Sequence, residues 1–556
     1  MRFRSLLFLI ILILLACIPT SAGVFAQEDL QSLLVADINY VSFEDLAFLS
    51  SKYDTWEVAA EKNTVKLMLT KSEFDQLSSM GYILSLDSTN TDLVNTPLES
   101  LPGQRAGIPG YACYRTVEET YAAAQSLASN YPTLVTLTKI GESWEKQNPG
   151  GLAGYDLMLL KLTSNDFTGD KPKILISSGV HARELAPVEL NLRFAEHLLD
   201  QYDNDADITW LLNYHEIHLL MITNPDGRKQ AETGLYWRKN TNETYCVSDS
   251  SRHGADLNRN FSFHWDSGYA SIEECNELYR GPVSLSEPES SALSSYELSL
   301  FPDQRGLADN DPAPLDATGI YIDLHSYGED VLWPYGFDTT SIAPNNTQLQ
   351  TFGRKLAYFT DYGPKQSSPT YVASGATDDY AYGTFGVASF TIEMGTTFFQ
   401  DCTSFENTIF PDNLEALLYA AKVARTPYMT PAGPDALDLV VPDGMLSFDQ
   451  SFPITANIND ARYQNVFEPT QNIAAAQYSV DQPPWESGVP LYSMSPQDGI
   501  YDSTIETVTA LVNPSGLSGG RHILYVRGQD IEGNWGSVSA VFFTIKYGFF
   551  FPLSYR

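Results

Sequence analysis

The stretch Ile174-Leu175-Ile176-Ser177-Ser178-Gly179-Val180-His181-Ala182-Arg183-Glu184 decides how the rest of the chain is interpreted. Its apolar beginning predicts a buried strand. Pro187 follows at a position suited to the start of a helix, and apolar residues recur after it at helical spacing. We therefore expect His181 and Glu184 in the turn between the C-terminal end of a strand and a helix. In open α/β sheets, ligands bind at that place.

A histidine and a glutamate separated by two residues can face one cation, and these two ligand types suit zinc. Such a short pattern is common. The alternative to a metal site is that His181 lies in a surface turn and that Glu184 is an acidic residue in the first turn of a helix, where the helix dipole favours it. A catalytic zinc needs one more protein ligand and an open position for water. Among the 8 histidines, His325 follows the strand-like run Gly319-Ile320-Tyr321-Ile322-Asp323-Leu324, so it lies at the same kind of strand end as His181. His215 and His218 stand at the beginning of their strand, and His325 is the better third ligand.

Composition and charge narrow the class of protein. The chain of 556 residues is long enough for several domains, and its 43% hydrophobic and 18% charged residues are typical of a globular protein. The net charge of -36 argues against nucleic acid or an anionic membrane surface as a partner.

Residues 1–26 have the features of an export signal, with Arg2 and Arg4 before an apolar core and small residues before Gln27. The apolar core is too short for a permanent membrane anchor, and no other stretch is long enough for one. We expect a secreted protein, with cell-surface attachment or a lipoprotein signal at Cys17 as the alternative.

The order of predicted elements divides the remaining chain. Residues 27–95 have the β-α-β-β-α-β order of a small α+β ferredoxin-like domain, and residues 96–110 have the composition of a linker. Residues 111–430 alternate strands and helices, which predicts an α/β domain with a mixed, mostly parallel sheet and flanking helices. Residues 431–546 predict a β-sandwich domain, and a short apolar tail occupies 547–556. A compact unit between an export signal and a cleavable linker suggests a propeptide.

Further motifs occur between about 113 and 425 and support one interpretation. They are His181-Ala182-Arg183-Glu184, Thr223-Asn224-Pro225-Asp226-Gly227, Trp237-Arg238-Lys239, Asp256-Leu257-Asn258-Arg259-Asn260, Tyr279-Arg280-Gly281-Pro282 with Ser286-Glu287-Pro288-Glu289, His325-Ser326-Tyr327, Tyr371-Val372-Ala373-Ser374-Gly375 and Phe390-Thr391-Ile392-Glu393. In this order, they resemble the zinc carboxypeptidases of the digestive carboxypeptidase A and B type. Chance agreement on one motif is common, but agreement on all of them is not.

The resemblance implies a role for each catalytic position. His181, Glu184 and His325 would hold one zinc ion. Glu393 would be the general base, and Arg238 would stabilise the negative charge that develops on the scissile carbonyl. Whether calcium also binds is left open by the sequence.

The resemblance also implies how a free C-terminus would be recognised. Asn258 and Arg259 match the family's clamp for the terminal carboxylate, and Tyr371 matches a mobile tyrosine that closes over the substrate. Arg183 matches a subsite residue further along the peptide. Asp378, counted back from Glu393, falls at the base of the specificity pocket, where a carboxylate favours C-terminal Lys or Arg. The alternative is that Asp378 pairs locally and specificity is broad.

Four cysteines remain after removal of the signal, and an even number in an exported chain favours disulfides with three possible connectivities. The resemblance pairs Cys246 with Cys275, which leaves Cys113 for Cys402.

As a whole, the resemblance implies a metallocarboxypeptidase that acts on peptide and protein C-termini and is inhibited by its own propeptide. The alternatives are a cell-wall peptide hydrolase on the same scaffold and a non-catalytic binding or adhesion protein.

Overall fold

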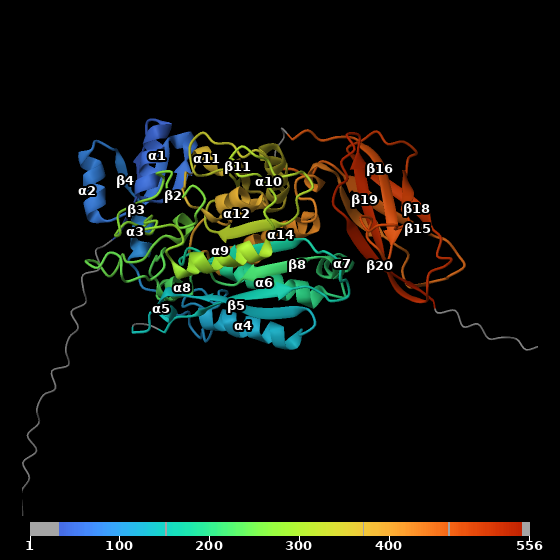
Figure 1. The fold of residues 1–556 in the computed structure, drawn as a ribbon, viewed down its shortest axis with the longest axis horizontal. Helices are drawn as coiled ribbons and strands as arrows, with labels where there is room; N and C mark the ends of the chain where they lie inside the picture. The colour runs from blue at the N-terminus through green and yellow to red at the C-terminus, as the bar shows by residue number, and fades with distance from the viewer. Residues whose placement is uncertain (1–32, 151–152, 371, 465–467, 547–556) are drawn as a thin grey trace, which may run out of the picture.

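The computed structural model describes residues 33–150, 153–370, 372–464 and 468–546. The predicted export signal, Tyr371 and the apolar tail 547–556 lie outside the described residues. Three units follow one another in Figure 1, with a small N-terminal domain in blue at one end, an α/β domain in the middle and a β domain in orange and red at the other end. Within the described part of the chain, no helix is both long and apolar enough to cross a bilayer.

The N-terminal domain has the predicted β-α-β-β-α-β order. Its elements are β1 (Leu34–Asn39), α1 (Phe43–Lys52), β2 (Asp54–Ala59), β3 (Thr64–Leu69), α2 (Lys71–Ser79) and β4 (Leu84–Leu86). The strands form an antiparallel sheet in the order β2-β3-β1-β4. A helix, α3 (Ser88–Val94), extends the domain toward the predicted linker. Near the end of that linker, Ile108 is fully buried, so this segment is anchored to the central domain and is not exposed throughout.

The central domain contains a mixed sheet of eight strands, as predicted. In chain order they are β5 (Val135–Glu142), β6 (Asp156–Leu162), β7 (Lys173–Ser178), β8 (Glu216–Leu220), β9 (Ile320–His325), β10 (Asp330–Trp333), β11 (Gly363–Gln366) and β12 (Ala388–Glu393). Their order across the sheet is β11-β10-β12-β9-β7-β8-β6-β5. The inner strands β8, β7, β9 and β12 run parallel, so their C-terminal ends meet at one edge.

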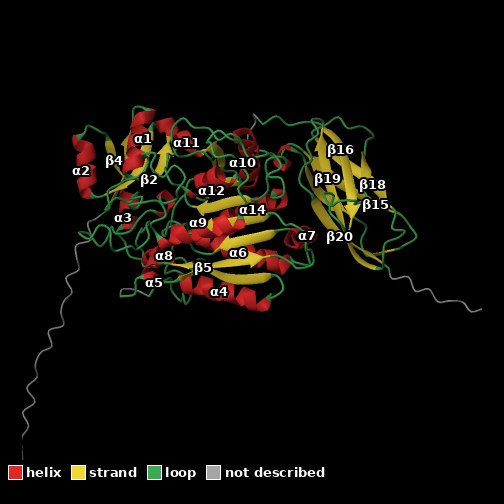
Figure 2. Ribbon diagram, viewed as in Figure 1, coloured by secondary structure: helices red, strands yellow, loops and turns green. Residues whose placement is uncertain are grey.

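Helices cover both faces of this sheet (Figure 2). Successive side chains of a strand point to opposite faces, and apolar side chains on each face pack against the helices there. Ile174 and Ile176 of β7 pack into the larger core, whereas Leu175 between them packs into a second core on the opposite face. The larger core includes α4 (Val117–Asn130), α6 (Leu185–Gln201), α10 (Asn346–Thr360) and α14 (Phe410–Val423). The second core includes α9 (Pro288–Leu300) and α12 (Thr377–Phe385).

The sequence Asn224-Pro225-Asp226-Gly227 has the residues typical of a turn, but in the structure it is not an isolated turn. It begins the helix α8 (Pro225–Ala231). The Asn224 side chain accepts a hydrogen bond from the backbone N–H of Gly227 at 3.0 Å, which caps the helix. Pro225 then occupies the first helical position, where its missing N–H costs nothing.

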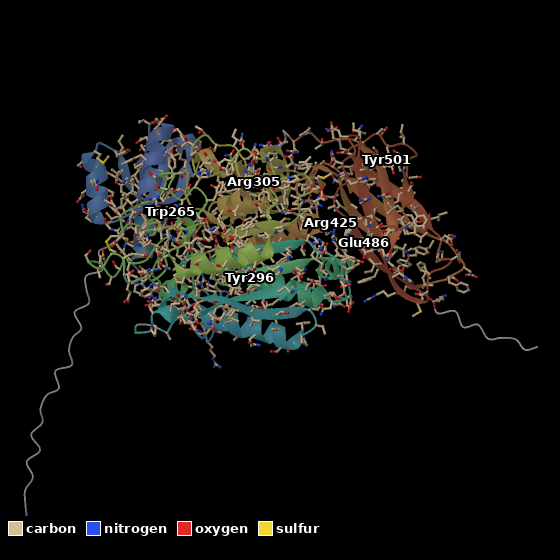
Figure 3. The ribbon with its side chains drawn as sticks, in the orientation of Figure 1. Trp265, Tyr296, Arg305, Arg425, Glu486 and Tyr501 are labelled. Atoms are coloured by element: carbon tan, nitrogen blue, oxygen red, sulfur yellow. A yellow bond between two sulfur atoms is a disulfide. The ribbon has the colours of Figure 1, made fainter. Side chains whose placement is uncertain are left out.

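The C-terminal domain is all β, as predicted, and its eight strands belong to one curled sheet that encloses a core of its own. Its strands are β13 (Asp435–Val440), β14 (Met445–Leu446), β15 (Phe452–Asn459), β16 (Ile473–Val480), β17 (Tyr492–Pro496), β18 (Ile505–Val512), β19 (Gly520–Asp530) and β20 (Ser539–Ile545). β17 pairs first with β16 and then with β18, so it passes from one layer to the other. At the junction with the central domain, Arg425 lies 5.2 Å from the ring of Trp485 and close to Glu486 (Figure 3).

Candidate active site

Two predicted metal ligands and the predicted general base lie at or just after the C-terminal ends of neighbouring parallel strands. His325 is the last residue of β9, and Glu393 is the last residue of β12. The register of the sheet pairs these two residues directly. β7 pairs with the other side of β9, and the chain reaches His181 shortly after β7 ends. The topology therefore brings together residues that are far apart in the sequence.

His181, Glu184 and His325 form a buried group that fits a single small cation. The Nδ1 atom of His181 lies 2.7 Å from Oε1 of Glu184, and Nδ1 of His325 lies 3.1 Å from Oε2 of the same carboxylate. The two Nδ1 atoms are 3.2 Å apart. One potential ligand atom from each residue lies within 4.8 Å of the others. Two imidazoles and one carboxylate, all facing one point, are a donor set that suits zinc.

The charges of this group agree with a cation site. Burial alone would raise the pKa of Glu184, but His181 and His325 hold it well below its usual range. Burial alone would lower the pKa of His325, but the carboxylates of Asp323 and Glu184 raise it well above its usual range. Positive charge is therefore favoured between these side chains, and a divalent cation would supply it in place of a proton.

The outer nitrogen of His181 faces a second carboxylate. Its Nε2 atom lies 3.2 Å from Oδ1 of Asp256, while Oδ2 of Asp256 accepts hydrogen bonds from Nε and Nη2 of Arg238 at 3.0 and 2.9 Å. Burial would raise the pKa of Asp256, but Arg238 and Arg259 hold it well below its usual range. An ionised Asp256 fixes the orientation of both His181 and Arg238. Asp256 belongs to the motif 256–260, but its contacts with His181 and Arg238 were not predicted.

Glu393 is partly buried beside the triad. Loss of hydration raises its pKa to about 8, with opposing effects from the His325 cation and the nearby carboxylates of Glu184 and Asp330. A carboxylate with a raised pKa accepts a proton more readily than an ordinary one.

The two residues expected to clamp a C-terminus lie next to the triad. Asn258 and Arg259 belong to a short 3-10 turn that Asp256 caps. The side-chain oxygen of Asn258 accepts a hydrogen bond from the backbone N–H of Thr377 at 2.9 Å, and its side-chain nitrogen is 3.5 Å from Nε2 of His325. Nη1 of Arg259 donates to the backbone oxygen of Asn258 at 2.7 Å.

Asp378 is buried in the first turn of α12. Its Oδ1 atom accepts a hydrogen bond from the backbone N–H of Asp379 at 2.9 Å, and Oδ2 lies 3.5 Å from the hydroxyl of Ser367. Burial raises the pKa of Asp378, and the charge of Asp323 adds to this effect. The carboxylate thus has few strong partners within the described part of the chain.

Both proposed disulfides are bonded in the structure. Cys246–Cys275 closes the segment that contains Asn258 and Arg259. Cys113–Cys402 joins the beginning of the central domain to the segment after β12.

Strand β2 of the N-terminal domain packs directly against this site. Both oxygens of Asp54 accept hydrogen bonds from Arg183, at 2.5 and 2.7 Å, and both side chains are buried. Two residues further, the ring of Trp56 stacks on Tyr236 at 5.6 Å and meets Phe398 edge to face at 5.1 Å. Because Arg183 adjoins the ligand Glu184, the N-terminal domain contacts the residue next to one of the predicted metal ligands. The sequence did not indicate which residues make this contact.

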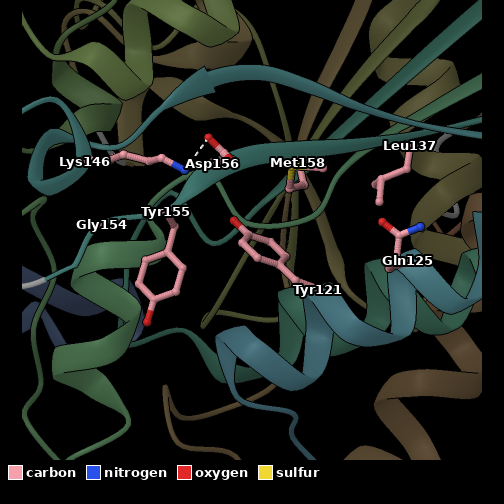
Figure 4. A pocket seen from close by; sticks show the side chains of 8 residues that line it. All are labelled: Tyr121, Gln125, Leu137, Lys146, Gly154, Tyr155, Asp156 and Met158. Atoms are coloured by element: carbon pink, nitrogen blue, oxygen red, sulfur yellow. Dashed lines mark ion pairs between the residues drawn. The ribbon is translucent and has the colours of Figure 1, made fainter.

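A separate hollow of about 270 Å³ lies where α4 meets β5 and β6 (Figure 4). Its lining includes the rings of Tyr121 and Tyr155 and an ion pair between Lys146 and Asp156 at 2.7 Å. None of the predicted site residues that the structure describes belongs to this lining, so the hollow is distinct from the triad.

Comparisons with known proteins agree with this geometry. A family model described as zinc carboxypeptidase matches residues 120–416, which is more than half of the chain. Carboxypeptidase B of Astacus astacus is 32% identical over 316 residues, which cover 55% of this chain and 94% of that protein. Carboxypeptidase A1 of Sus scrofa is 30% identical over 301 residues, which cover 52% of this chain and 64% of that protein. The chain therefore spans less than two thirds of that relative.

A solved structure, that of carboxypeptidase A from Helicoverpa armigera, superimposes with a TM-score of 0.56 at 23% identity and covers 71% of this chain and 98% of that chain. At this identity the likeness concerns the fold. The family model, the relatives and the fold agree, and the chain belongs to the zinc carboxypeptidase family.

Proposed function

We propose that this chain is a zinc-dependent metallocarboxypeptidase that removes the C-terminal residue from peptides and proteins. The observation that carries the proposal is the convergence of His181, Glu184 and His325 beside Glu393, at one edge of the sheet in a chain of this family. A non-catalytic adhesion protein would have no need for a general base next to a complete ligand set.

When bound, zinc supplies a Lewis acid for the scissile carbonyl and lowers the pKa of a water molecule. Glu393 takes the proton of the attacking water and later delivers it to the leaving amine. The guanidinium of Arg238, held by Asp256, stabilises the negative charge that develops on the carbonyl oxygen.

Side chains next to the metal ligands recognise the substrate. Asn258 and Arg259 bind the terminal carboxylate, and Tyr371 closes over the bound residue, a role that rests on the family resemblance alone. Arg183 binds the peptide upstream of the scissile bond. Asp378 favours a C-terminal Lys or Arg, because a cationic side chain would stabilise the ionised form of a carboxylate whose pKa is raised by burial.

We further infer that the N-terminal domain is an inhibitory propeptide. Asp54 forms an ion pair with Arg183, so Arg183 is not available to bind the substrate. The ring of Trp56 packs against the neighbouring aromatic side chains. Cleavage within residues 96–110 would release the domain outside the cell, after export by the signal at residues 1–26.

The test is hydrolysis of blocked dipeptides that end in Arg, Lys, Phe, Leu or Glu, after the linker has been cleaved. We expect release of the C-terminal residue that a chelator abolishes. Glu393→Gln should lower kcat by about 10²- to 10⁴-fold while zinc content stays unchanged. Glu415→Gln, the same change at an exposed position of α14, is the matched control.

Activity of Glu393→Gln equal to that of Glu415→Gln would disprove the role of Glu393. Failure to release any residue from these peptides, with zinc bound, would turn attention to branched cell-wall peptides as the substrate.

A further inference from the structure

A buried chain of hydrogen bonds leads away from His325 and has no part in the reaction described above. It lies on the face of the sheet that α9 and α12 cover. On β9, Ile320 and Ile322 point to the larger core, while Tyr321 points to this second face. Asp323 and His325 follow at intervals of two residues, so they share the face of Tyr321.

Asp323 makes three hydrogen bonds and is fully buried. Its Oδ2 atom lies 2.9 Å from Nε2 of His325 and accepts a hydrogen bond from the hydroxyl of Thr377 at 2.6 Å. Its Oδ1 atom accepts a hydrogen bond from the hydroxyl of Ser177 at 2.7 Å. Ser177 is the register partner of Asp323 on β7, so the backbone of two paired strands fixes this contact. The carboxylate is therefore held from three directions.

Thr377 is the first residue of α12, and it contacts two parts of the site at once. Its hydroxyl donates to Asp323, while its backbone N–H donates to Asn258 of the proposed carboxylate clamp. The hydroxyl contact depends on the side chain, whereas the backbone contact does not. A substitution at Thr377 can therefore test the first contact without removing the second.

We propose that Asp323 is the residue that positions His325 for the metal, and that the Thr377 hydroxyl holds Asp323 in place. This inference rests on the proposed function for the identity of the metal. A carboxylate facing Nε2 keeps the proton on that nitrogen and leaves the lone pair of Nδ1 directed at Glu184 and His181. Asp256 stands in the same relation to His181, so each metal-binding histidine has its own buried carboxylate.

The measurement is the affinity of the metal-free full chain for Zn²⁺, in competition with a chromophoric chelator. We expect Asp323→Asn to weaken zinc binding about 10- to 100-fold, the usual effect of losing such a partner. Thr377→Val should weaken it about tenfold, as for the loss of one hydrogen bond to a charged group, and Thr377→Ser should restore it. Ser389→Ala is the matched control, because Ser389 is equally buried but donates only to the backbone oxygen of Asp378.

The absorption spectrum of Co²⁺ in place of Zn²⁺ gives a second readout, since it changes when His325 turns within the ligand set. Circular dichroism and thermal unfolding of the metal-free variants show whether each one folds. Zinc affinity of Asp323→Asn within twofold of the wild type would overturn the inference, and so would an equal loss in Ser389→Ala.

The outcome separates this inference from the proposed function. A wild-type chain that binds zinc tightly but releases no residue from any peptide would refute the proposed function, while the variants would still decide the role of Asp323. A wild-type chain without affinity for zinc would refute both.

Discussion

The contact between Asp54 and Arg183 offers a direct way to activate the chain without cleaving it. Asp54→Ala removes the carboxylate that both terminal nitrogens of Arg183 contact, and it leaves Arg183 available for substrate. If this contact keeps the N-terminal domain in place, the uncleaved variant should hydrolyse blocked dipeptides that the uncleaved wild type hydrolyses slowly. Mutating Arg183 would be less informative, because the same residue is proposed to bind the peptide.

The size of the effect follows from the burial of the pair. The Arg183 and Asp54 side chains are 0% and 1% exposed. Removing one member of a buried ion pair leaves the other charge without compensation and costs about 3–5 kcal/mol. At the lower figure, the ratio of open to covered enzyme rises roughly 100-fold. The stacking of Trp56 on Tyr236 remains, so we expect partial activation rather than complete release.

The assay is the initial rate of the uncleaved chain, with mass spectrometry to show that the linker is intact and with the cleaved enzyme as the upper limit. The control is Glu73→Gln, which removes the charge that pairs with Arg252 at 3.1 Å in a less buried contact between the same two domains. Glutamine still serves in the capping box of α2, and the weaker pair should change the rate less than about tenfold.

Two results would refute the reasoning. A wild-type chain as active before cleavage as after it would show that β2 does not block the site. An Asp54→Ala chain as slow as Glu73→Gln, although cleavage activates both, would show that the cover depends on other contacts.

Three further predictions concern specificity, metal and pH. Asp378→Asn should lower kcat/KM about 10- to 100-fold for peptides that end in Lys or Arg, and it should leave kcat/KM for peptides that end in Leu nearly unchanged. Equal losses for all substrates would reject the role of Asp378 in the specificity pocket. Removal of zinc should lower the melting temperature in calorimetry, since a ligand at 1,000 times its Kd stabilises the fold by about 4 kcal/mol; an unchanged temperature would argue against the triad as the metal site. Burial raises the pKa of Glu289 to about 8, whereas the unfolded chain releases this proton near 4.5. The stability from this group is therefore present below pH 4.5 and lost as pH rises through 8, and Glu289→Gln should flatten the decline in melting temperature between pH 5 and 9. If the melting temperature of Glu289→Gln declines as steeply as that of the wild type, the pH dependence comes from other groups.

The residues at the strand ends could be predicted because the inner strands are buried on both faces. Such strands are nearly continuous apolar runs, and a polar residue that ends one of them is conspicuous. The run before His325 comes close to this form, so local sequence placed His325 at the ligand-binding edge. In β12, Ser389 and Thr391 interrupt the apolar residues, and Glu393 was predicted from the family resemblance. The same argument placed His181 in the turn after β7.

Other elements carry no comparable signal. α9 has the sequence PESSALSSYELSL and buries Glu297 and several serines, so its buried side lacks an apolar stripe and the helix was not predicted. β10 and β11 have four residues each, too few for a period to show. The contact between Asp54 and Arg183 joins two domains and depends on their docking, which no local pattern encodes.

Asp323 could have been found from the sequence. It stands two residues before His325 on a predicted strand, and such residues share a face. A carboxylate at that position is a candidate partner for the outer nitrogen of a metal-binding histidine. The role of Thr377 could not have been found in this way, because it depends on how α12 packs against β9.

The arrangement of the parallel strands also sets the order of events as the protein forms. His181 and His325 are 144 residues apart in the chain, and they meet only when β7 and β9 pair. Parallel neighbours need long crossover connections, which close late because their entropic cost comes before any stabilising contact. In a zinc finger the ion binds a short segment and drives its folding. Here no short segment contains the ligand set, so the ion enters a domain whose sheet has already assembled.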